Sequence, residues 1–436
     1  MANSPKDRGA DRDRPELDDD RTGIDRRTFL QQGGRAALGL GAFGVTYAAR
    51  AADLPADAPT IQKYVPLGKT GLVISDIGFG SSGCPSADIV RHCYDRGMNY
   101  FDTAEGYGID GWNQGDEGDY VENLLGEVLH DKRDKVVITS KYFAEAKDDR
   151  KLIMSKLEES LKRLRTDYVD IYLNHAINDF DRLKNPEWFE FVELAKKQGK
   201  IRFSGISGHG GQLQECVEYA IDHDMADVIL CSHNFGSDPK FYEKFMKKFD
   251  WVANQAGIRR VFEKAHDKGV GVIAMKTQMG GKLNDLSAYE AEGSTFQEAS
   301  LRWVLSDPNV DAAIISMESV ELADKYIRAS GKRGVRASDA RILEHYVRTQ
   351  STDYCRPGCS GCESACPLGV QIADTLRQRM YAKRYGNLPL ARSGYAALGR
   401  DASACLSCSG QPCESACEFG LEIAALTRET AALLSA

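Results

Sequence analysis

Two runs of cysteines near the end of this 436-residue chain have residue types and spacings that could bind metal. Eight of the twelve cysteines lie in these runs. Thiolate sulfur is a preferred ligand of zinc and of the iron in iron-sulfur clusters, and short gaps let several sulfurs reach one site. The candidate ligands are Cys355, Cys359, Cys362 and Cys366 in the first run, and Cys405, Cys408, Cys413 and Cys417 in the second.

The spacing of both runs is close to the C-x2-C-x2-C-x3-C-P pattern with which bacterial ferredoxins bind 4Fe-4S clusters. The first run has one extra residue and ends in Pro367, whereas the second has a longer middle gap and Glu418 in place of proline. In two-cluster ferredoxins the fourth cysteine of each run binds the other cluster, which here would exchange Cys366 and Cys417. The pattern therefore predicts two 4Fe-4S clusters.

Two alternatives to the clusters remain open at this point. Four-cysteine zinc sites use similar short spacings. Disulfides form readily in exported proteins, although a Cys-x2-Cys pair suits one shared metal better than a bridge between neighbours. The isolated cysteines are interpreted as small buried hydrophobic residues, and they are Cys84, Cys93, Cys216 and Cys231.

The first 51 residues indicate an exported protein. Residues 1–24 are crowded with Asp, Arg and Pro and are predicted to be disordered. The pair Arg26-Arg27 then precedes a Gly/Ala/Leu-rich stretch, and Ala49-Arg50-Ala51 offers a small-x-small cleavage pattern. This is typical of a twin-arginine signal, which predicts a periplasmic or otherwise exported protein. The alternative is a short amphipathic arm with a chance arginine pair.

Charge and hydropathy narrow the range of partners. The formal net charge of −8 argues against nucleic acid as a partner. No other apolar run is long enough to cross a bilayer, so no stable membrane span is expected after removal of the signal. Together these features favour a small-molecule substrate and, if iron-sulfur clusters are present, a redox partner.

The middle of the chain alternates short apolar runs with amphipathic helical patterns such as that at 152–164. Eight strands that are each followed by a helix predict an α/β fold, a (β/α)8 barrel over residues 61–335. A hairpin is expected at 64–75, and a small, mostly helical ferredoxin-like domain over 345–436. The expected strands are 77–80, 99–102, 136–140, 169–174, 203–206, 228–231, 271–275 and 312–316.

Four polar residues follow or end three consecutive predicted strands. Asp102 ends the second strand and Tyr107 follows it, while Lys141 follows the third strand and His175 the fourth. Active sites of α/β barrels lie at the carboxyl ends of the strands, so these side chains are expected to meet at one rim. Each also has a purely structural interpretation, as a strand-end cap, a rim aromatic, a surface charge or a hydrogen-bonded histidine.

Six segments in order resemble the aldo/keto reductase family, in particular a branch with a C-terminal ferredoxin-like tail. The segments are YVPLGKTGLVISDIGFG from Tyr64, FDTAEGYG from Phe101, ITSK from Ile138, SLKRLRTDYVDIYLNH from Ser160, GKIRFSGIS from Gly199 and LRWVLSDPNV from Leu301. The resemblance implies carbonyl reduction or its reverse. Tyr107 would donate the proton, Lys141 would lower the phenol pKa, Asp102 would hold the lysine, and His175 would orient the substrate oxygen or share the proton.

The resemblance also implies NADP(H) or NAD(H) as a cofactor. The residues expected to hold it are Ser207, Gly208, Lys276, Gly280, Gly281 and Ser316. The residue types at four positions differ from those with which the family binds the nucleotide, and these positions are Gly208, Leu230, Glu318 and Tyr326. A carboxylate at Glu318 would repel an adenosine 2'-phosphate. Three interpretations stay open: altered nucleotide binding, an iron-sulfur electron-transfer protein whose barrel has lost the nucleotide, and a catalytically silent scaffold.

Overall fold

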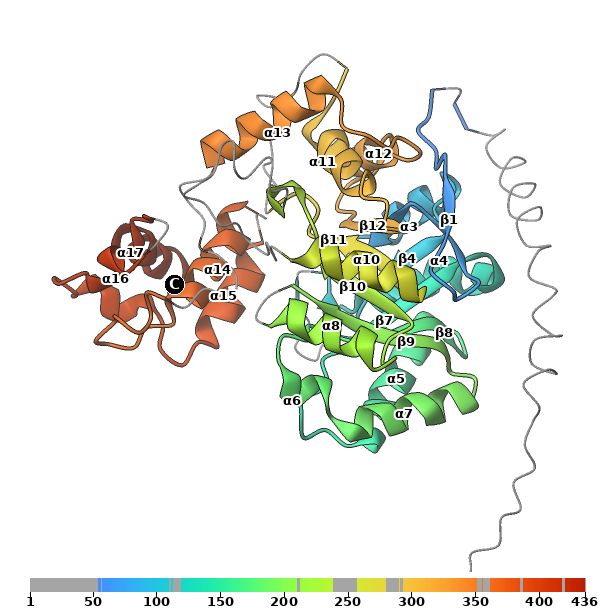
Figure 1. The fold of residues 1–436 in the computed structure, drawn as a ribbon, viewed down its shortest axis with the longest axis horizontal. Coiled ribbons are helices and arrows are strands. Elements are labelled where there is room, and N and C mark those ends of the chain that lie inside the picture. Colours follow the sequence, from blue (N-terminus) through green and yellow to red (C-terminus); the bar gives the residue numbers. More distant parts are fainter. Residues whose placement is uncertain are drawn as a thin grey trace, which may run out of the picture. The chain divides into compact units, whose positions relative to one another are not determined.

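Eight parallel strands close into a barrel in the computed structural model, in the order β10-β11-β12-β3-β4-β7-β8-β9. This confirms the predicted (β/α)8 fold, and each expected strand is present (Figure 1). The strands are β3 (Ile77–Gly80), β4 (Tyr100–Asp102), β7 (Val137–Tyr142), β8 (Val169–Asn174), β9 (Ile201–Gly208), β10 (Val228–Ser232), β11 (Gly271–Met275) and β12 (Ala312–Ser316).

The structure describes residues 54–55, 57–109, 111–112, 119–209, 212–237, 257–279, 290, 293–350, 355, 361–384, 387–417 and 420–435. The predicted arm and twin-arginine signal of residues 1–51 lie outside these ranges, as do Cys359, Gly280 and Gly281. No helix of the described residues is long and apolar enough to cross a membrane.

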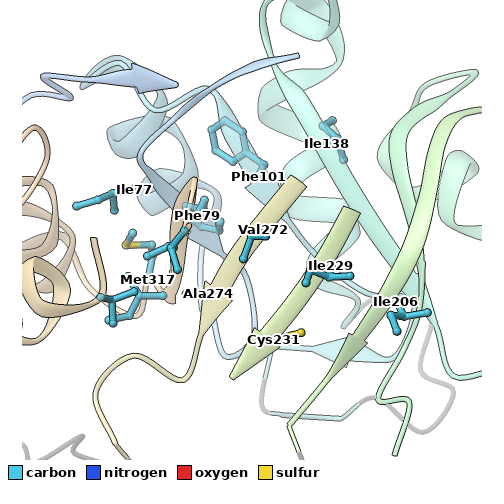
Figure 2. Close-up of a cluster of buried hydrophobic side chains, with 14 of the residues drawn as sticks. Ile77, Phe79, Phe101, Ile138, Ile206, Ile229, Cys231, Val272, Ala274 and Met317 are labelled. Atoms are coloured by element: carbon cyan, nitrogen blue, oxygen red, sulfur yellow. The ribbon is translucent and has the colours of Figure 1, made fainter. Parts of the chain in front are cut away.

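Successive strand residues face opposite sides, and this alternation builds two apolar layers. Val228 and Leu230 belong to the cluster inside the barrel, whereas Ile229 and Cys231 belong to the cluster between the strands and the surrounding helices. Figure 2 shows part of the outer cluster, where side chains of several strands lie close together. Cys84, Cys93, Cys216 and Cys231 are all fully buried, so their interpretation as hydrophobic core residues is confirmed.

A hairpin of β1 (Tyr64–Pro66) and β2 (Val73–Ser75) precedes the barrel, as predicted. Its apolar side chains, including Leu67 and Ile74, join the interior cluster. Leu67 lies against Gly271, where a Cβ would come within 2.7 Å of its side chain. Because Gly271 begins β11, the hairpin closes the amino end of the barrel and leaves the carboxyl end for the site.

The helices follow the strands and cover them from outside (Figure 1). In α5, the Asp149 side chain accepts a hydrogen bond from Leu152 N and caps the first turn. The helices of this part are α3 (Ala87–Asp95), α4 (Val121–Leu129), α5 (Arg150–Leu164), α6 (Phe180–Leu183), α7 (Pro186–Lys197), α8 (Leu213–Asp222), α10 (Ile258–Lys268), α11 (Phe296–Leu305), α12 (Val320–Ile327) and α13 (Ala337–Gln350).

The stretch between the two predicted domains, residues 336–344, falls on the start of α13. The carboxylate of Asp339 in this helix is buried and pairs with Arg302 of α11 at 3.2 Å. Arg336 adds a second partner at 3.1 Å. The Arg302–Asp339 pair fastens the first turn of α13 to α11 of the barrel, whereas Arg336 lies on the same segment as Asp339.

The C-terminal region consists of short helices around an apolar core of its own, which includes Leu376, Tyr395 and Leu434. Its helical character agrees with the prediction for residues 345–436, whereas its likeness to ferredoxins stays a prediction. The helices are α14 (Ile372–Arg384), α15 (Leu388–Ala396), α16 (Pro412–Ser415) and α17 (Ile423–Leu434), with a 3-10 turn, η5 (Ala402–Leu406).

Candidate active site

The four residues expected at the rim come from neighbouring elements at the carboxyl end of the barrel. Asp102 ends β4, Lys141 lies near the end of β7, and His175 directly follows β8. Tyr107 begins a small hairpin of β5 (Tyr107–Gly108) and β6 (Gly111–Trp112) in the loop after β4. Because β4, β7 and β8 are hydrogen-bonded neighbours, the fold brings these loops to one edge.

Lys141 is held in a fixed position beneath the rim. Its side chain is 1% exposed, and its Nζ lies 2.7 Å from Asp102 Oδ1 and 2.6 Å from the carbonyl oxygen of Thr103. A buried ammonium keeps its charge only when it is paired in this way. The same Nζ lies 5.0 Å from the centre of the Tyr107 ring.

His175 also lies beside Tyr107. The two rings meet edge to face with their centroids 5.7 Å apart and an interplanar angle of 79°. Burial, followed by the positive charge of Lys141, holds the pKa of His175 well below its usual value. The imidazole is therefore neutral at neutral pH and can orient a substrate by a hydrogen bond without adding charge.

The protonation of Tyr107 differs in part from the sequence-based expectation. Lys141 does lower the pKa of the phenol, as expected, but burial raises it more strongly and the net pKa is above its ordinary value. For Lys141, burial lowers the pKa, while Asp102 and Tyr107 together raise it above normal. The resting site thus holds a neutral phenol beside a permanent ammonium, which suits a proton donor.

A cavity of about 270 Å3 opens beside this group at the carboxyl end of the barrel. Asp102, Tyr107 and His175 line it. Several other lining side chains carry buried polar atoms that have no partner among the described residues, and these atoms are Ser81 Oγ, Thr277 Oγ1 and Gln278 Nε2. Buried polar groups are usually hydrogen-bonded, so unpartnered ones around a cavity fit a polar ligand.

The residues expected to hold the nucleotide divide into three sets. Lys276 and Ser316 line the cavity. Gly280 and Gly281 lie outside the described residues. Ser207 and Gly208 are not among the lining residues: the Ser207 hydroxyl accepts a bond from Ala176 N at 3.3 Å, and a Cβ on Gly208 would come within 2.6 Å of Ile177 O.

The positions that depart from the family pattern also separate in space. Glu318 lines the cavity, and it lies close to Gly83, where a Cβ would be 3.1 Å from its Oε1. Tyr326 is buried beside Gln278. Leu230 belongs to the apolar interior of the barrel and therefore offers no polar group to a ligand.

Sequence reasoning missed the loop after β3 as a source of polar cavity residues, and in the loop after β11 it named Lys276 but not the polar residues that follow it. Ser81 and Ser82 follow β3, and Thr277 and Gln278 follow β11. Their place just after a predicted strand is the signal that could have found them. Of two histidines near strand ends, His209 lines the cavity, whereas His233 packs against Trp303 with its Nε2 3.5 Å from Asp307.

Four cysteines of the C-terminal region border one small hollow, and they are Cys366, Cys405, Cys408 and Cys413. All four are free thiols. Arg428 also lines the hollow, and its guanidinium donates hydrogen bonds to the carbonyl oxygens of Cys405 at 3.0 Å and Cys408 at 2.6 Å. No group of three or more His, Cys, Asp or Glu side chains in the described chain is spaced to hold a single metal ion.

The closed barrel and its strand-end group of Tyr, Lys, Asp and His define an α/β-barrel protein with a site suited to proton transfer. A model of the aldo/keto reductase family matches residues 84–291, which include all four side chains. L-galactose dehydrogenase of Arabidopsis thaliana is 25% identical over 301 residues, 60% of this chain and 86% of that protein. The 6-dehydroglucose reductase of Novosphingobium aromaticivorans is 32% identical over 171 residues, 35% of this chain and 53% of that protein.

These matches show that residues 84–291 resemble the aldo/keto reductase family, and they support an oxidoreductase. Similar solved structures include an aldo-keto reductase from Klebsiella pneumoniae in complex with NADPH, at 23% identity and a TM-score of 0.48, covering 66% of this chain and 96% of that one. Another is the holo form of an aldo-keto reductase from Bacillus halodurans, at 21% identity and a TM-score of 0.48, covering 65% and 95%.

Proposed function

We propose that this protein is an NAD(P)(H)-dependent enzyme that reduces a small carbonyl compound or oxidises the corresponding alcohol. The observation that carries the proposal is the buried Lys141, fixed between Asp102 and Thr103 with its ammonium 5.0 Å from the Tyr107 ring. A phenol held beside an ammonium and next to a cavity is equipped to give a proton to an oxygen that gains negative charge.

The nicotinamide, when bound, supplies or accepts the hydride at carbon. In the reduction, the Tyr107 hydroxyl binds the carbonyl oxygen and transfers its proton there. The Lys141 ammonium stabilises the resulting phenolate, and Asp102 keeps the ammonium charged and aimed. The neutral His175 ring beside Tyr107 orients the substrate oxygen.

The cavity offers polar groups to a nicotinamide nucleotide, because buried, unpartnered atoms of Ser81, Thr277 and Gln278 line it. Lys276 supplies a cation at the same cavity. Glu318 favours NAD(H) over NADP(H), since a carboxylate can accept from a ribose 2'-hydroxyl but repels a 2'-phosphate.

We further propose that the C-terminal region holds two 4Fe-4S clusters. The hollow bordered by Cys366, Cys405, Cys408 and Cys413 supports the exchange of the fourth cysteine, because the thiol that joins the second run is that of Cys366. Four free thiols line one hollow, and three of them belong to the second run of the ferredoxin-like pattern, which supports a cluster there. The other set is Cys355, Cys359, Cys362 and Cys417.

The proposal includes export by the twin-arginine route, supported by Arg26-Arg27 and the following apolar stretch. This route carries folded proteins, so the cofactors would be loaded before translocation. A periplasmic enzyme with clusters also implies a redox partner. Two of the relatives described above are named for conversions of sugars, so small sugars are the first substrates to assay.

The proposal is tested with protein purified under argon, whose nucleotide content and carbonyl reduction with NADH and NADPH are measured. We expect Tyr107→Phe to lower kcat by about 10²–10⁴-fold while the iron content stays unchanged. Tyr168→Phe is the matched control, because Tyr168 immediately precedes β8 at the opposite end of the barrel. Unchanged turnover in Tyr107→Phe would remove the tetrad from the mechanism. If neither nucleotide binds, the electron-transfer protein with a barrel that has lost its nucleotide is the better account.

A further inference from the structure

One wall of the active-site cavity comes from the C-terminal region and not from the barrel. Tyr381 of α14, together with Asn387 and Leu390 around the start of α15, lines the same cavity as Tyr107 and His175. All three of these C-terminal side chains are half-buried. The cavity is therefore lined partly by the barrel and partly by residues that lie more than 270 positions after Tyr107 in the chain.

The C-terminal region also lies against the hairpin that carries Tyr107. Helix α15 contacts β6, the partner strand of β5, and Tyr107 pairs with Trp112 across this hairpin. Burial is the main cause of the raised pKa of Tyr107, and the nearby Tyr381 phenol contributes in the same direction. Two separate observations thus place the wall next to the proton donor.

The geometry of Asn387 shows which of its groups is available to a ligand. Its Oδ1 accepts a hydrogen bond from Leu390 N at 3.0 Å and caps α15. Its backbone N donates to the carbonyl oxygen of Tyr381 at 3.0 Å, which ties the two lining residues together. Because the cap uses the oxygen, the group that Asn387 can present is its amide NH2.

We propose that Tyr381 and Asn387 are specificity-determining residues that bind hydroxyl groups next to the reacting carbonyl. The wall has no charged side chain among its lining residues in the described chain, and a phenol and an amide suit neutral hydroxyl groups. The substrate class is therefore a small, neutral, hydroxylated aldehyde or ketone, while Leu390 packs against its carbon chain. This inference rests on the carbonyl-reductase function proposed above and assigns its substrate-binding wall.

The test compares glyceraldehyde, which carries two hydroxyl groups, with propanal, which has none. The variants are Asn387→Ser and Asn387→Asp, which both keep a good helix cap but remove the amide NH2, and Tyr381→Phe, which keeps the ring. Arg392→Ala is the matched control, since Arg392 is exposed on α15, the helix that Asn387 caps. Kinetics and calorimetric binding of both aldehydes are measured with the full-length holoenzyme.

We expect each variant to raise KM for glyceraldehyde about fivefold to tenfold, while kcat and the KM for propanal change little. Arg392→Ala should leave both substrates unaffected. An unchanged preference for glyceraldehyde in all three variants would overturn the role of the wall even if the enzyme is active. If the wild type reduces neither aldehyde, the proposed function fails, and weaker glyceraldehyde binding in the variants would then still identify the wall as a binding surface.

Discussion

The barrel and the C-terminal region hold their reactive side chains by different means. In the barrel, Asp102 and Lys141 stand on neighbouring strands whose backbone hydrogen bonds fix their positions before any ligand arrives. In the C-terminal region, Cys405 and Cys408 lie in and just after a short 3-10 turn, and Cys413 lies in the four-residue α16. The core around these cysteines is much smaller than that of the barrel.

This difference indicates where each region obtains its stability. A large apolar core supports the buried ion pair of the barrel, whose desolvation is unfavourable. With the proposed clusters bound, a region of short helices with a small core would depend more on its metal, because a ligand that binds only the folded state stabilises that state. The two regions should therefore respond differently to the loss of one side chain.

The largest expected effect is that of Lys141→Met on catalysis. The phenolate of Tyr107 then loses its ammonium, and kcat should fall by about 10³-fold or more, with iron content unchanged. The variant should also lose about 3–5 kcal/mol of stability, because Asp102 is left as an unpaired buried charge. Adding Asp102→Asn should recover much of the stability but none of the activity. Chemical denaturation measures the stability of the two variants, and steady-state kinetics measures their activity. Full activity in Lys141→Met would contradict the mechanism.

Loss of a thiol should affect the other region. Cys405→Ser is expected to release iron and to lower the thermal stability of the C-terminal region, while the barrel keeps its own transition. Iron content, calorimetry and limited proteolysis follow the change, with Ser409→Ala as an exposed control in the same run. Because α14 carries both Ile372 at the cysteine hollow and Tyr381 at the active-site cavity, the KM for glyceraldehyde should rise as well. A protein that keeps full iron in Cys405→Ser would remove Cys405 from the ligand set.

A smaller effect is expected on the relative affinity for NADPH and NADH. Glu318→Gln removes the charge that opposes a 2'-phosphate, so the affinity for NADPH should increase about tenfold relative to NADH. Fluorescence titration with both nucleotides measures the ratio. Glu321→Gln is the matched control, because Glu321 is exposed in the first turn of α12. An unchanged ratio would show that Glu318 does not contact the adenosine ribose.

The smallest effect concerns acid stability. His175 has a pKa well below its usual value in the folded protein because it is buried, so the unfolded chain binds a proton that the folded chain does not. Stability should therefore be unaffected above pH 6.5 and decrease below it, by up to about 1.4 kcal/mol per pH unit. His175→Gln should flatten this decrease in urea unfolding curves, whereas His223→Gln on the exposed surface should not. Equal slopes in all three proteins would argue against a neutral, buried His175.

Much of the fold could be predicted from local patterns. The strand predicted at 169–174 is β8 (Val169–Asn174) and that at 271–275 is β11 (Gly271–Met275), because short apolar runs between helical patterns leave few alternatives. The order of the strands then followed from the repeat of strand and helix, and it placed the tetrad at one rim. The hollow in the C-terminal region brings Cys366 beside three cysteines of the second run, whereas the assignment of ligands to clusters stays a prediction.

The sequence by itself determined the elements, the chemical types at the strand ends and the ligand-like spacing of the cysteines, because these depend on residues close in the chain. Only the tertiary structure decided that burial outweighs Lys141 in the pKa of Tyr107, and that Ser207 turns its hydroxyl to the backbone. It alone brought Tyr381 and Asn387 to the cavity. Such features depend on which distant surfaces pack together and exclude water, and no local spacing specifies that.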